Sequence, residues 1–507
     1  MVHRGKLSAA CGPCRSRRLK CDQKRPSCSQ CIRAKRECSD YRDVSAGRFY
    51  DQTEEVKRKN SPSSRQQLSP STSVVRQQMA IPLKDQGTAF ALSRFLSRAV
   101  GSNLVHMLST PSARAVTASI NAVGLAALSN IHQSPQLMRT ARQEYVSALA
   151  ETNAVLSDQV QATSHASLVA VTFLGMYELM TCDGRPTLMD NYIKHLDGSV
   201  RILQLRGTQQ LQDSVGLSLF TQSRIPIVLF NFWLKQSTPS WLVQLSFEAL
   251  AYRGGGGAAM EDALFFLMLQ VGDLCAGLRN GALLEPAQAM KEALRLDAEL
   301  SSWATSVEPS RRYTVVSLPK SVDAGNGNSA FRHVYSNYYH IYPDAVVSAW
   351  WNDYRFVRLL LLEVICWLAD YLTRKEGIDA RNEYRQTVAQ CRMLSQQLTE
   401  DICASVPYNL GATEVSSYED WSSTRTGGVI RLIWPLFIAA DSGGATSRMT
   451  DWIADTLLRI GYGVGIRQAL AMSNRLRAKR PLYWLLSLHE LEHDFKRCNN
   501  NGLGLRN

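Results

Sequence analysis

Residues 11–38 read CGPCRSRRLKCDQKRPSCSQCIRAKREC, and six of these residues are cysteines. The cysteines form one half-pattern written twice, because each member of the first half recurs 17 positions later. Two tetrahedral zinc ions need eight ligand positions, and six thiolates fill them only if two thiolates bridge both metals. The spacing therefore predicts a binuclear zinc cluster with the ligands Cys11, Cys14, Cys21, Cys28, Cys31 and Cys38.

Positive charge is concentrated around these cysteines. Residues 1–42 contain twelve Lys and Arg residues and three Asp and Glu residues, a formal charge of +9, while the whole chain of 507 residues carries +13. The other 465 residues therefore carry only +4. A compact cationic surface beside a rigid metal core attracts phosphates, and nucleic acid is the commonest partner of such a surface. We expect residues 1–42 to form a small DNA-binding module.

At these residues the sequence resembles the fungal binuclear zinc cluster transcription factors, the Zn(2)-C6 or galactose-regulator type of DNA-binding module. The resemblance implies that Cys11 and Cys28 bridge two zinc ions and that each other cysteine binds one ion. It also implies that a first short helix, roughly residues 13–19, enters the major groove of double-stranded DNA and reads a CGG triplet. The family's basic segment between the second and third cysteines supplies the expected DNA contacts, which are Arg15, Arg17, Arg18 and Lys20.

The chain departs from the usual family pattern at two positions. Arg18 stands where lysine is usual, and an arginine can bond both O6 and N7 of guanine. Arg15 and Lys20 are expected to lie toward phosphates, which position the protein without specifying sequence. Lys35 stands where many members carry a glycine that ends the second helix, so this departure affects only the geometry at the C-terminal end of that helix.

A disulfide framework and a finger that binds only protein are the alternative interpretations of these cysteines. No apolar segment of sufficient length precedes the cluster, so we expect no secretory signal peptide. Six later cysteines lie scattered in apolar surroundings, as reduced core residues do. The arginine run inside the cysteine frame argues against a site that binds only protein.

Residues 43–84 are rich in Ser, Pro and Gln and predict a disordered linker. Residues 57–59, Lys-Arg-Lys, fit a nuclear import signal and a solvated charge run equally well. Apolar residues keep no heptad here, so the sequence gives no coiled-coil support for a homodimer. A monomer and a dimer formed through the larger domain both stay open.

From about residue 87 onward apolar residues recur at helical steps, as in residues 145–156, 168–180 and 192–205. Strand alternation is scarce, so residues 85–500 predict an all-α domain of packed antiparallel helices, followed by a tail at residues 501–507. The tyrosines at 335, 338, 339 and 342 also have helical spacing, and core packing is the favoured interpretation.

This region resembles the fungal-specific transcription factor domain in the second of its common forms. The resemblance rests on residues 191–198 and their continuation to 207, and on residues 351–355, 434–436 and 467–469. It implies a regulatory domain that senses a small-molecule effector or a protein partner and controls the output of the DNA-bound protein through the transcription machinery or co-regulators. This form occurs often in regulators of nutrient use and of clustered secondary-metabolite pathways.

Two further features bear on alternative functions. The most apolar run, residues 359–369, is about half as long as a membrane span and predicts a buried helix, so we expect no membrane partner. His489, Glu490 and His493 fit the H-E-x-x-H pattern of zinc hydrolases, but residues 494–507 contain no His or Glu as a third ligand. The sequence thus predicts a nuclear, sequence-specific regulator of RNA polymerase II genes and not an enzyme. A zinc hydrolase and a metabolite sensor without direct DNA reading are the alternatives.

Overall fold

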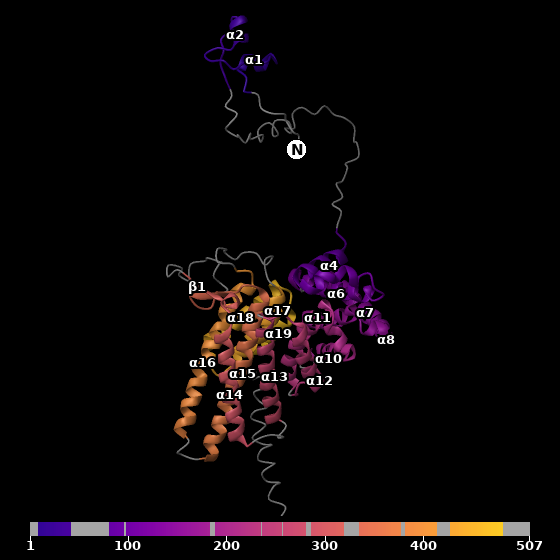
Figure 1. Ribbon diagram of the computed structural model, residues 1–507, viewed down its shortest axis with the longest axis vertical. Helices are drawn as coiled ribbons and strands as arrows, with labels where there is room; N and C mark the ends of the chain where they lie inside the picture. The colour runs from indigo at the N-terminus through magenta and orange to yellow at the C-terminus, as the bar shows by residue number, and fades with distance from the viewer. Residues whose placement is uncertain are drawn as a thin grey trace, which may run out of the picture. The chain divides into compact units, whose positions relative to one another are not determined.

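The computed structural model describes residues 9–41, 81–95, 98–182, 188–234, 236–255, 257–279, 285–318, 334–376, 381–412 and 426–479. The chain divides into two compact units, residues 1–79 and 80–507. The first unit contains the short helices α1 (Gly12–Ser16) and α2 (Ser29–Arg33), and the second contains the other described elements (Figure 1). The predicted all-α class is confirmed, since the described ranges contain only two short strands.

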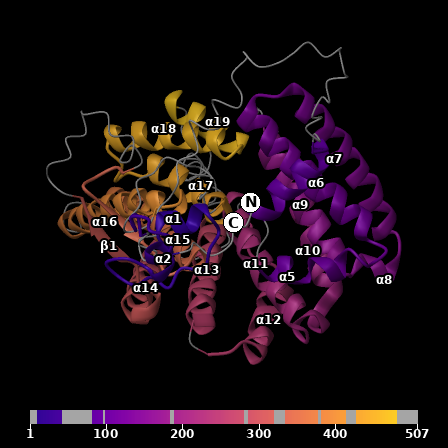
Figure 2. The same ribbon diagram turned by 90° about the horizontal axis from the view of Figure 1, so that it is seen from above.

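The second unit is a body of packed helices. Its first half comprises α4 (Leu83–Arg94), α5 (Arg98–Met107), α6 (Ala113–His132), α7 (Pro135–Leu156), α8 (Gln159–Ala162), α9 (His165–Thr181), α10 (Leu188–Arg206), α11 (Ser214–Leu234) and α12 (Ser240–Ala249). Its second half comprises α13 (Gly257–Arg279), α14 (Pro286–Ser306), α15 (Ala345–Glu376), α16 (Arg381–Asn409), α17 (Thr426–Asp441), α18 (Ser447–Gly463) and α19 (Arg467–Arg477). Figure 2 shows α6–α10 grouped on one side and α14–α19 on the other, with α11 and α13 between them.

Polar caps fix where several of these helices begin. The side chains of Ser134, Ser164 and Thr446 accept hydrogen bonds from the backbone N–H groups three residues later. Such caps satisfy donors that the first turn of a helix cannot pair. Helix α4 begins at Leu83, so residues 83 and 84 of the expected linker belong to this helix. Residues 81 and 82 are also described, and the rest of residues 43–84 lies outside the described ranges.

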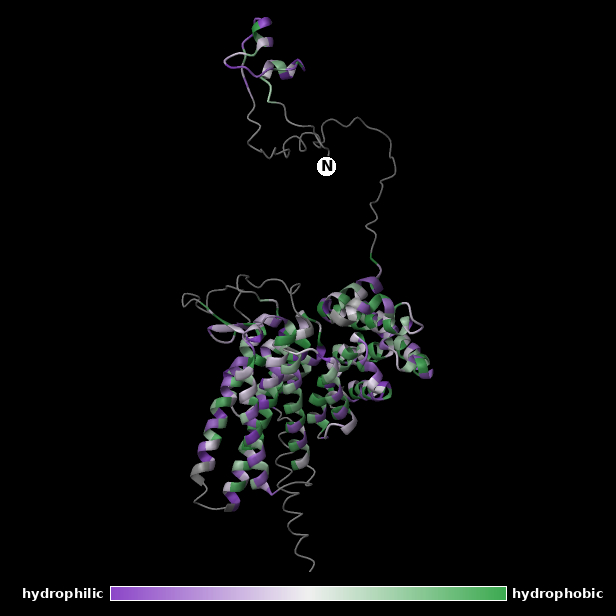
Figure 3. Ribbon diagram, viewed as in Figure 1, coloured by the Kyte–Doolittle hydropathy of each residue, from purple (hydrophilic) through white to green (hydrophobic). Residues whose placement is uncertain are grey.

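Helix α15 forms the centre of the second half. It packs against α13, α14, α16 and α17, and residues 359–362 are four consecutive leucines that are all buried. A helix that is apolar on every side must be enclosed by other elements. Outside this leucine run, α15 and the other helices carry both hydrophilic and hydrophobic residues (Figure 3), as helices with one solvent-facing side do. The prediction of a buried helix at residues 359–369 is confirmed, and no helix in the described ranges combines the length and apolar character of a bilayer crossing.

A small antiparallel hairpin precedes α15. Strand β1 (Thr314–Ser317) pairs with β2 (Tyr338–Ile341), with Thr314 opposite Ile341. The helical spacing expected for the four tyrosines is therefore wrong, because β-branched partners in β1 and aromatic residues in β2 favour a strand pair. Their predicted core packing is confirmed for Tyr339 and Tyr342, which are buried.

Buried ion pairs connect helices within the body. The guanidinium of Arg224 in α11 donates to the carboxylate of Asp262 in α13, and both side chains are almost completely buried. Arg253 donates to the same carboxylate from 3.1 Å. Arg431 in α17 likewise pairs with Asp353 in α15. Because an unpaired charge is costly to bury, these pairs fix which helices lie against each other.

Candidate metal centre and nucleic-acid interface

The two helices of the small unit begin at equivalent points of the cysteine repeat. Cys11 is the N-cap residue of α1 and Cys28 is the N-cap residue of α2. Pro13 lies in the first turn of α1, where its missing N–H group costs nothing. Helix α1 ends at Ser16, so it is shorter than the expected range of residues 13–19.

The backbone repeats with the cysteines after each helix. The N–H group of Leu19 donates to the carbonyl of Cys14 over 2.9 Å, and that of Arg36 donates to Cys31 over 3.0 Å. These two bonds are equivalent, because the two donors are 17 positions apart in the sequence and so are the two acceptors. The repeat seen in the sequence is therefore a repeat of three-dimensional structure, in which each half presents its cysteines in the same way.

The six sulfur atoms gather in two groups of four. One group contains Cys14 and Cys21, the other contains Cys31 and Cys38, and both contain Cys11 and Cys28. Within each group all ligand atoms lie within 4.8 Å of one another. Two four-sulfur groups with two shared members are the arrangement that six thiolates need to surround two tetrahedral metal ions.

Individual sulfur separations agree with zinc. The Sγ atoms of Cys11 and Cys28 are 3.7 Å apart, those of Cys14 and Cys28 are 3.7 Å apart, and those of Cys11 and Cys21 are 3.8 Å apart. A zinc ion with Zn–S bonds of about 2.3 Å places the corners of its tetrahedron about 3.8 Å apart. A disulfide would require about 2.0 Å, and all six cysteines are free.

The chemistry of the sulfurs also calls for a cation. Cys11, Cys14, Cys28 and Cys31 are buried. Burial raises the pKa of the Cys14 thiol to about 12 and raises the pKa of Cys31 as well. Without a cation Cys14 and Cys31 would stay neutral thiols, whereas zinc binds the deprotonated form and offsets its charge. The donor set therefore fits a pair of zinc ions.

Two supporting residues, Asp22 and Tyr41, were missed at the sequence level. The Asp22 carboxylate accepts from the Ser29 hydroxyl over 2.6 Å and from the Ser29 N–H group over 3.1 Å, at the start of α2. The Tyr41 hydroxyl donates to the Lys24 carbonyl over 2.8 Å and lies 3.0 Å from the Cys38 sulfur. Both residues join parts of the module that are far apart in sequence. The Ser29 hydroxyl, followed by the Ser29 N–H group, lowers the pKa of Asp22 by favouring its charged form.

Arg15 binds the module itself. Its Nη1 atom donates to the carbonyl of Ala10 and, over 2.7 Å, to the carbonyl of Asp40, and its Nη2 atom lies 3.8 Å from the Asp40 carboxylate. Its side chain is only 21% exposed. These contacts join the segment before the first cysteine to the segment after the last, so Arg15 has a structural role beside the phosphate contact expected from the sequence.

The other three basic residues predicted to contact DNA are exposed. Arg17 caps the end of α1, Arg18 follows it, and Lys20 comes directly before Cys21. None of these side chains forms a hydrogen bond or ion pair with the residues described for this unit. Their charges are therefore available to an external anion, next to a helix held by the cysteine cluster.

The remaining sequence motifs have structural roles or lie outside the described ranges. The ranges that the structure describes do not include His489, Glu490 and His493, or residues 57–59 and 501–507. In α15, the Nε1 atom of Trp351 donates to the Arg311 carbonyl over 3.1 Å. Residues 351–355 thus contribute to the packing of the body.

Comparison with known proteins agrees with the cysteine geometry. Residues 9–47 match the family described as the fungal Zn(2)-Cys(6) binuclear cluster domain. The chain matches no curated protein and no solved structure. Residues 9–47 are therefore a fungal Zn(2)-Cys(6) binuclear cluster domain, which holds two zinc ions on six cysteines and is the DNA-binding part of a zinc-cluster transcription factor.

Proposed function

We propose that this protein acts in the nucleus as a zinc-dependent regulator of RNA polymerase II genes that reads CGG triplets in the major groove. The observation that carries the proposal is the pair of exposed arginines at the end of α1, Arg17 and Arg18, beside a cluster that fixes the direction of the helix. The fork of an arginine matches O6 and N7 of guanine, and a rigid helix end restricts which base it can reach.

In this proposal the zinc ions serve folding and not catalysis. Each four-sulfur group is complete, so neither metal would keep a position for water or substrate. Cys11 and Cys28, which belong to both four-sulfur groups, would be the bridging ligands, and each of the other four cysteines would bind one ion. Removing zinc should therefore abolish DNA binding by unfolding the module, because structural thiolate sites are folded by their metal.

The same proposal assigns the remaining parts of the chain. Residues 1–42 form the DNA-binding domain, residues 43–84 a linker, and residues 85–500 a regulatory domain of the fungal-specific type in its second form. The all-α body supports this assignment, since a regulatory domain needs a core independent of the zinc module. Its output would reach the transcription machinery or co-regulators, and its target genes would belong to nutrient use or a secondary-metabolite cluster.

Fluorescence anisotropy on two labelled duplexes tests the proposal. The zinc-loaded full chain is titrated onto a CGG duplex and onto a duplex of the same composition with the triplet scrambled, over a series of salt concentrations. We expect tighter binding to CGG, loss of that binding with a chelator, and recovery when zinc is restored. Equal affinity for both duplexes at every salt concentration would contradict triplet reading, and chelator-resistant binding would contradict the role of zinc.

A further inference from the structure

A cavity of about 110 Å³ lies inside the helical body. Its walls come from α9, α10 and α11 of the first half and from α13, α15, α17 and α19 of the second. Most of the lining is apolar and aromatic, and includes Ile225, Leu229, Phe232, Phe356 and Trp434. Pockets of this composition between helices are where small molecules commonly bind.

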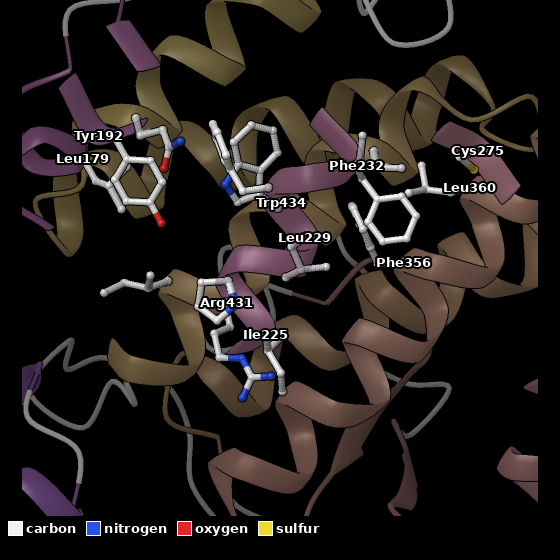
Figure 4. Close-up of a pocket in the computed structure, with 15 residues that line it drawn as sticks. Leu179, Tyr192, Ile225, Leu229, Phe232, Cys275, Phe356, Leu360, Arg431 and Trp434 are labelled. Atoms are coloured by element: carbon white, nitrogen blue, oxygen red, sulfur yellow. The ribbon is translucent and has the colours of Figure 1, made fainter. Parts of the chain in front are cut away.

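The two ends of the cavity differ in chemistry. Figure 4 shows Leu179 and Tyr192 at one end, Phe356 and Leu360 at the other, and Trp434 between them. The Tyr192 hydroxyl forms no hydrogen bond with any residue that the structure describes. Burial raises the pKa of Tyr192 to about 12, so the phenol stays neutral and can donate a hydrogen bond. The cavity thus has a phenol hydroxyl at one end, and the rest of its wall is apolar apart from Arg431 and Gln468.

The charge at the wall is already neutralised. Arg431 is the charged residue among those that line the cavity, and its guanidinium pairs with the Asp353 carboxylate. Asp353 is only 1% exposed, so water could not take the place of Arg431 as the hydrogen-bond donor to this carboxylate. An anionic ligand would compete with a buried carboxylate for Arg431, and a cationic ligand would find no carboxylate among the residues that line the cavity. The site therefore favours a neutral molecule.

We propose that this cavity binds a small neutral molecule with an aromatic or short alkyl body and one hydroxyl or carbonyl group, which bonds to the Tyr192 hydroxyl. The volume is smaller than the ~150 Å³ of a dry apolar cavity that holds benzene in another protein, so it limits the ligand to a single ring. The proposal goes beyond the function of the zinc module, because every residue that carries it belongs to the second unit. It can hold or fail whether or not the protein reads CGG.

Three related probes test the ligand class by isothermal titration of the zinc-loaded full chain. The probes are 4-ethylphenol, ethylbenzene, which lacks the hydroxyl group, and 4-ethylbenzoate, which carries a negative charge. We expect saturable binding of 4-ethylphenol, with ethylbenzene weaker by about tenfold for the loss of a buried hydrogen bond. The carboxylate should bind least. Tightest binding of 4-ethylbenzoate, or no saturable binding of any probe, would overturn the proposal.

Substitutions locate the site. Tyr192→Phe keeps the ring and removes the hydroxyl, so 4-ethylphenol and ethylbenzene should then bind with equal affinity. Leu229→Trp fills the cavity and should abolish binding of both, while Leu128→Trp makes the same change in size on α6, away from the cavity, and should leave binding intact. An unchanged preference for 4-ethylphenol in Tyr192→Phe would overturn the assignment, even if Leu229→Trp failed to fold.

Discussion

Arg18 and Lys35 occupy equivalent positions of the cysteine repeat, and both hold the backbone in the left-handed region, with φ values of 55° and 48°. Each residue follows the cap of its helix, Arg17 or Ala34. Left-handed geometry at this point is the usual way to end a helix, and glycine adopts it without a clash of Cβ. For other residues it costs roughly 1–2 kcal/mol.

Lys35→Gly should stabilise the zinc-loaded module by about 0.5–1 kcal/mol, because the relief of strain exceeds the entropy that glycine adds to the unfolded chain. Zinc affinity reports this change, since metal binding and folding are coupled in such modules. Competition with a chelator should show two- to fivefold tighter zinc retention, as estimated from that free energy. Lys35→Ala also removes the charge but keeps Cβ, and it should show no gain. Equal gains in both variants would attribute the effect to charge.

Arg15→Lys should weaken zinc retention by about tenfold. Lysine keeps the charge but lacks the planar guanidinium that donates to the carbonyls of both Ala10 and Asp40. Arg18→Lys is the matched control, since the exposed Arg18 side chain bonds to no described residue of the module. The same chelator competition measures both variants. Loss of DNA affinity in Arg15→Lys without loss of zinc would show that Arg15 acts only on phosphate.

Arg18→Ala should cost about 1–3 kcal/mol on a CGG duplex and flatten the preference over mutated triplets, if Arg18 reads guanine as proposed. Lys20→Ala should instead weaken binding to all duplexes alike. It should also reduce the slope of log affinity against log salt concentration by about one, as the loss of one phosphate contact does. Anisotropy over a salt series separates the two effects. Uniform losses in Arg18→Ala would make Arg18 a phosphate contact, and an unchanged slope in Lys20→Ala would remove Lys20 from that role.

The zinc centre could be predicted from the sequence because its information is local. Six cysteines within 28 residues, in a half-pattern that repeats after 17 positions, predicted a binuclear cluster with two bridging thiolates, and the family resemblance identified the two as Cys11 and Cys28. The inward turn of Arg15 could not be predicted, since it depends on Asp40, 25 residues later. Nothing in the spacing of basic residues separates a guanidinium that bonds to the module from one that faces solvent.

The helical class of the body could also be predicted, since apolar residues at steps of three and four are a property of each helix alone. The hairpin was missed because strand pairing is a contact between distant segments. Tyr338 lies opposite Ser317 in the hairpin, whereas the spacing of the tyrosines along the chain fitted a helix. The cavity was missed for the same reason, since seven helices contribute to it and none contains its chemistry alone.

Asp262→Asn should destabilise the helical body by about 3–5 kcal/mol, because it leaves the guanidinium of Arg224 buried without a carboxylate. Asp455→Asn is the control, since the Arg477–Asp455 pair is exposed and should contribute less than about 1 kcal/mol. All ten tryptophans lie in residues 80–507, so intrinsic fluorescence during denaturant unfolding reports this unit. Similar losses in both variants would contradict a special role for the buried pair.

His340 should make the body less stable in acid. Burial first, and then the charge of Arg355, lower the pKa of His340 to about 2, although Asp401 lies 3.9 Å from its ring. In the unfolded chain His340 gains a proton near pH 6.5, and in the folded chain it does not. The contribution of His340 to stability is therefore fully present above that pH and decreases as the pH drops below it. As the pH falls from 7 to 5, the free energy of unfolding should decrease by about 2 kcal/mol because of this residue.

Comparison of His340→Gln with the unchanged chain isolates that contribution from other groups that titrate in the same range. The free energy of unfolding, followed by tryptophan fluorescence, should fall by about 2 kcal/mol less between pH 7 and pH 5 in the variant, whatever its stability at pH 7. His132→Gln replaces an exposed histidine at the end of α6 and should leave the acid response unchanged. An equal acid response in His340→Gln and the unchanged chain would mean that His340 takes up its proton in the folded state, where Asp401 would then outweigh the burial of the ring and the charge of Arg355.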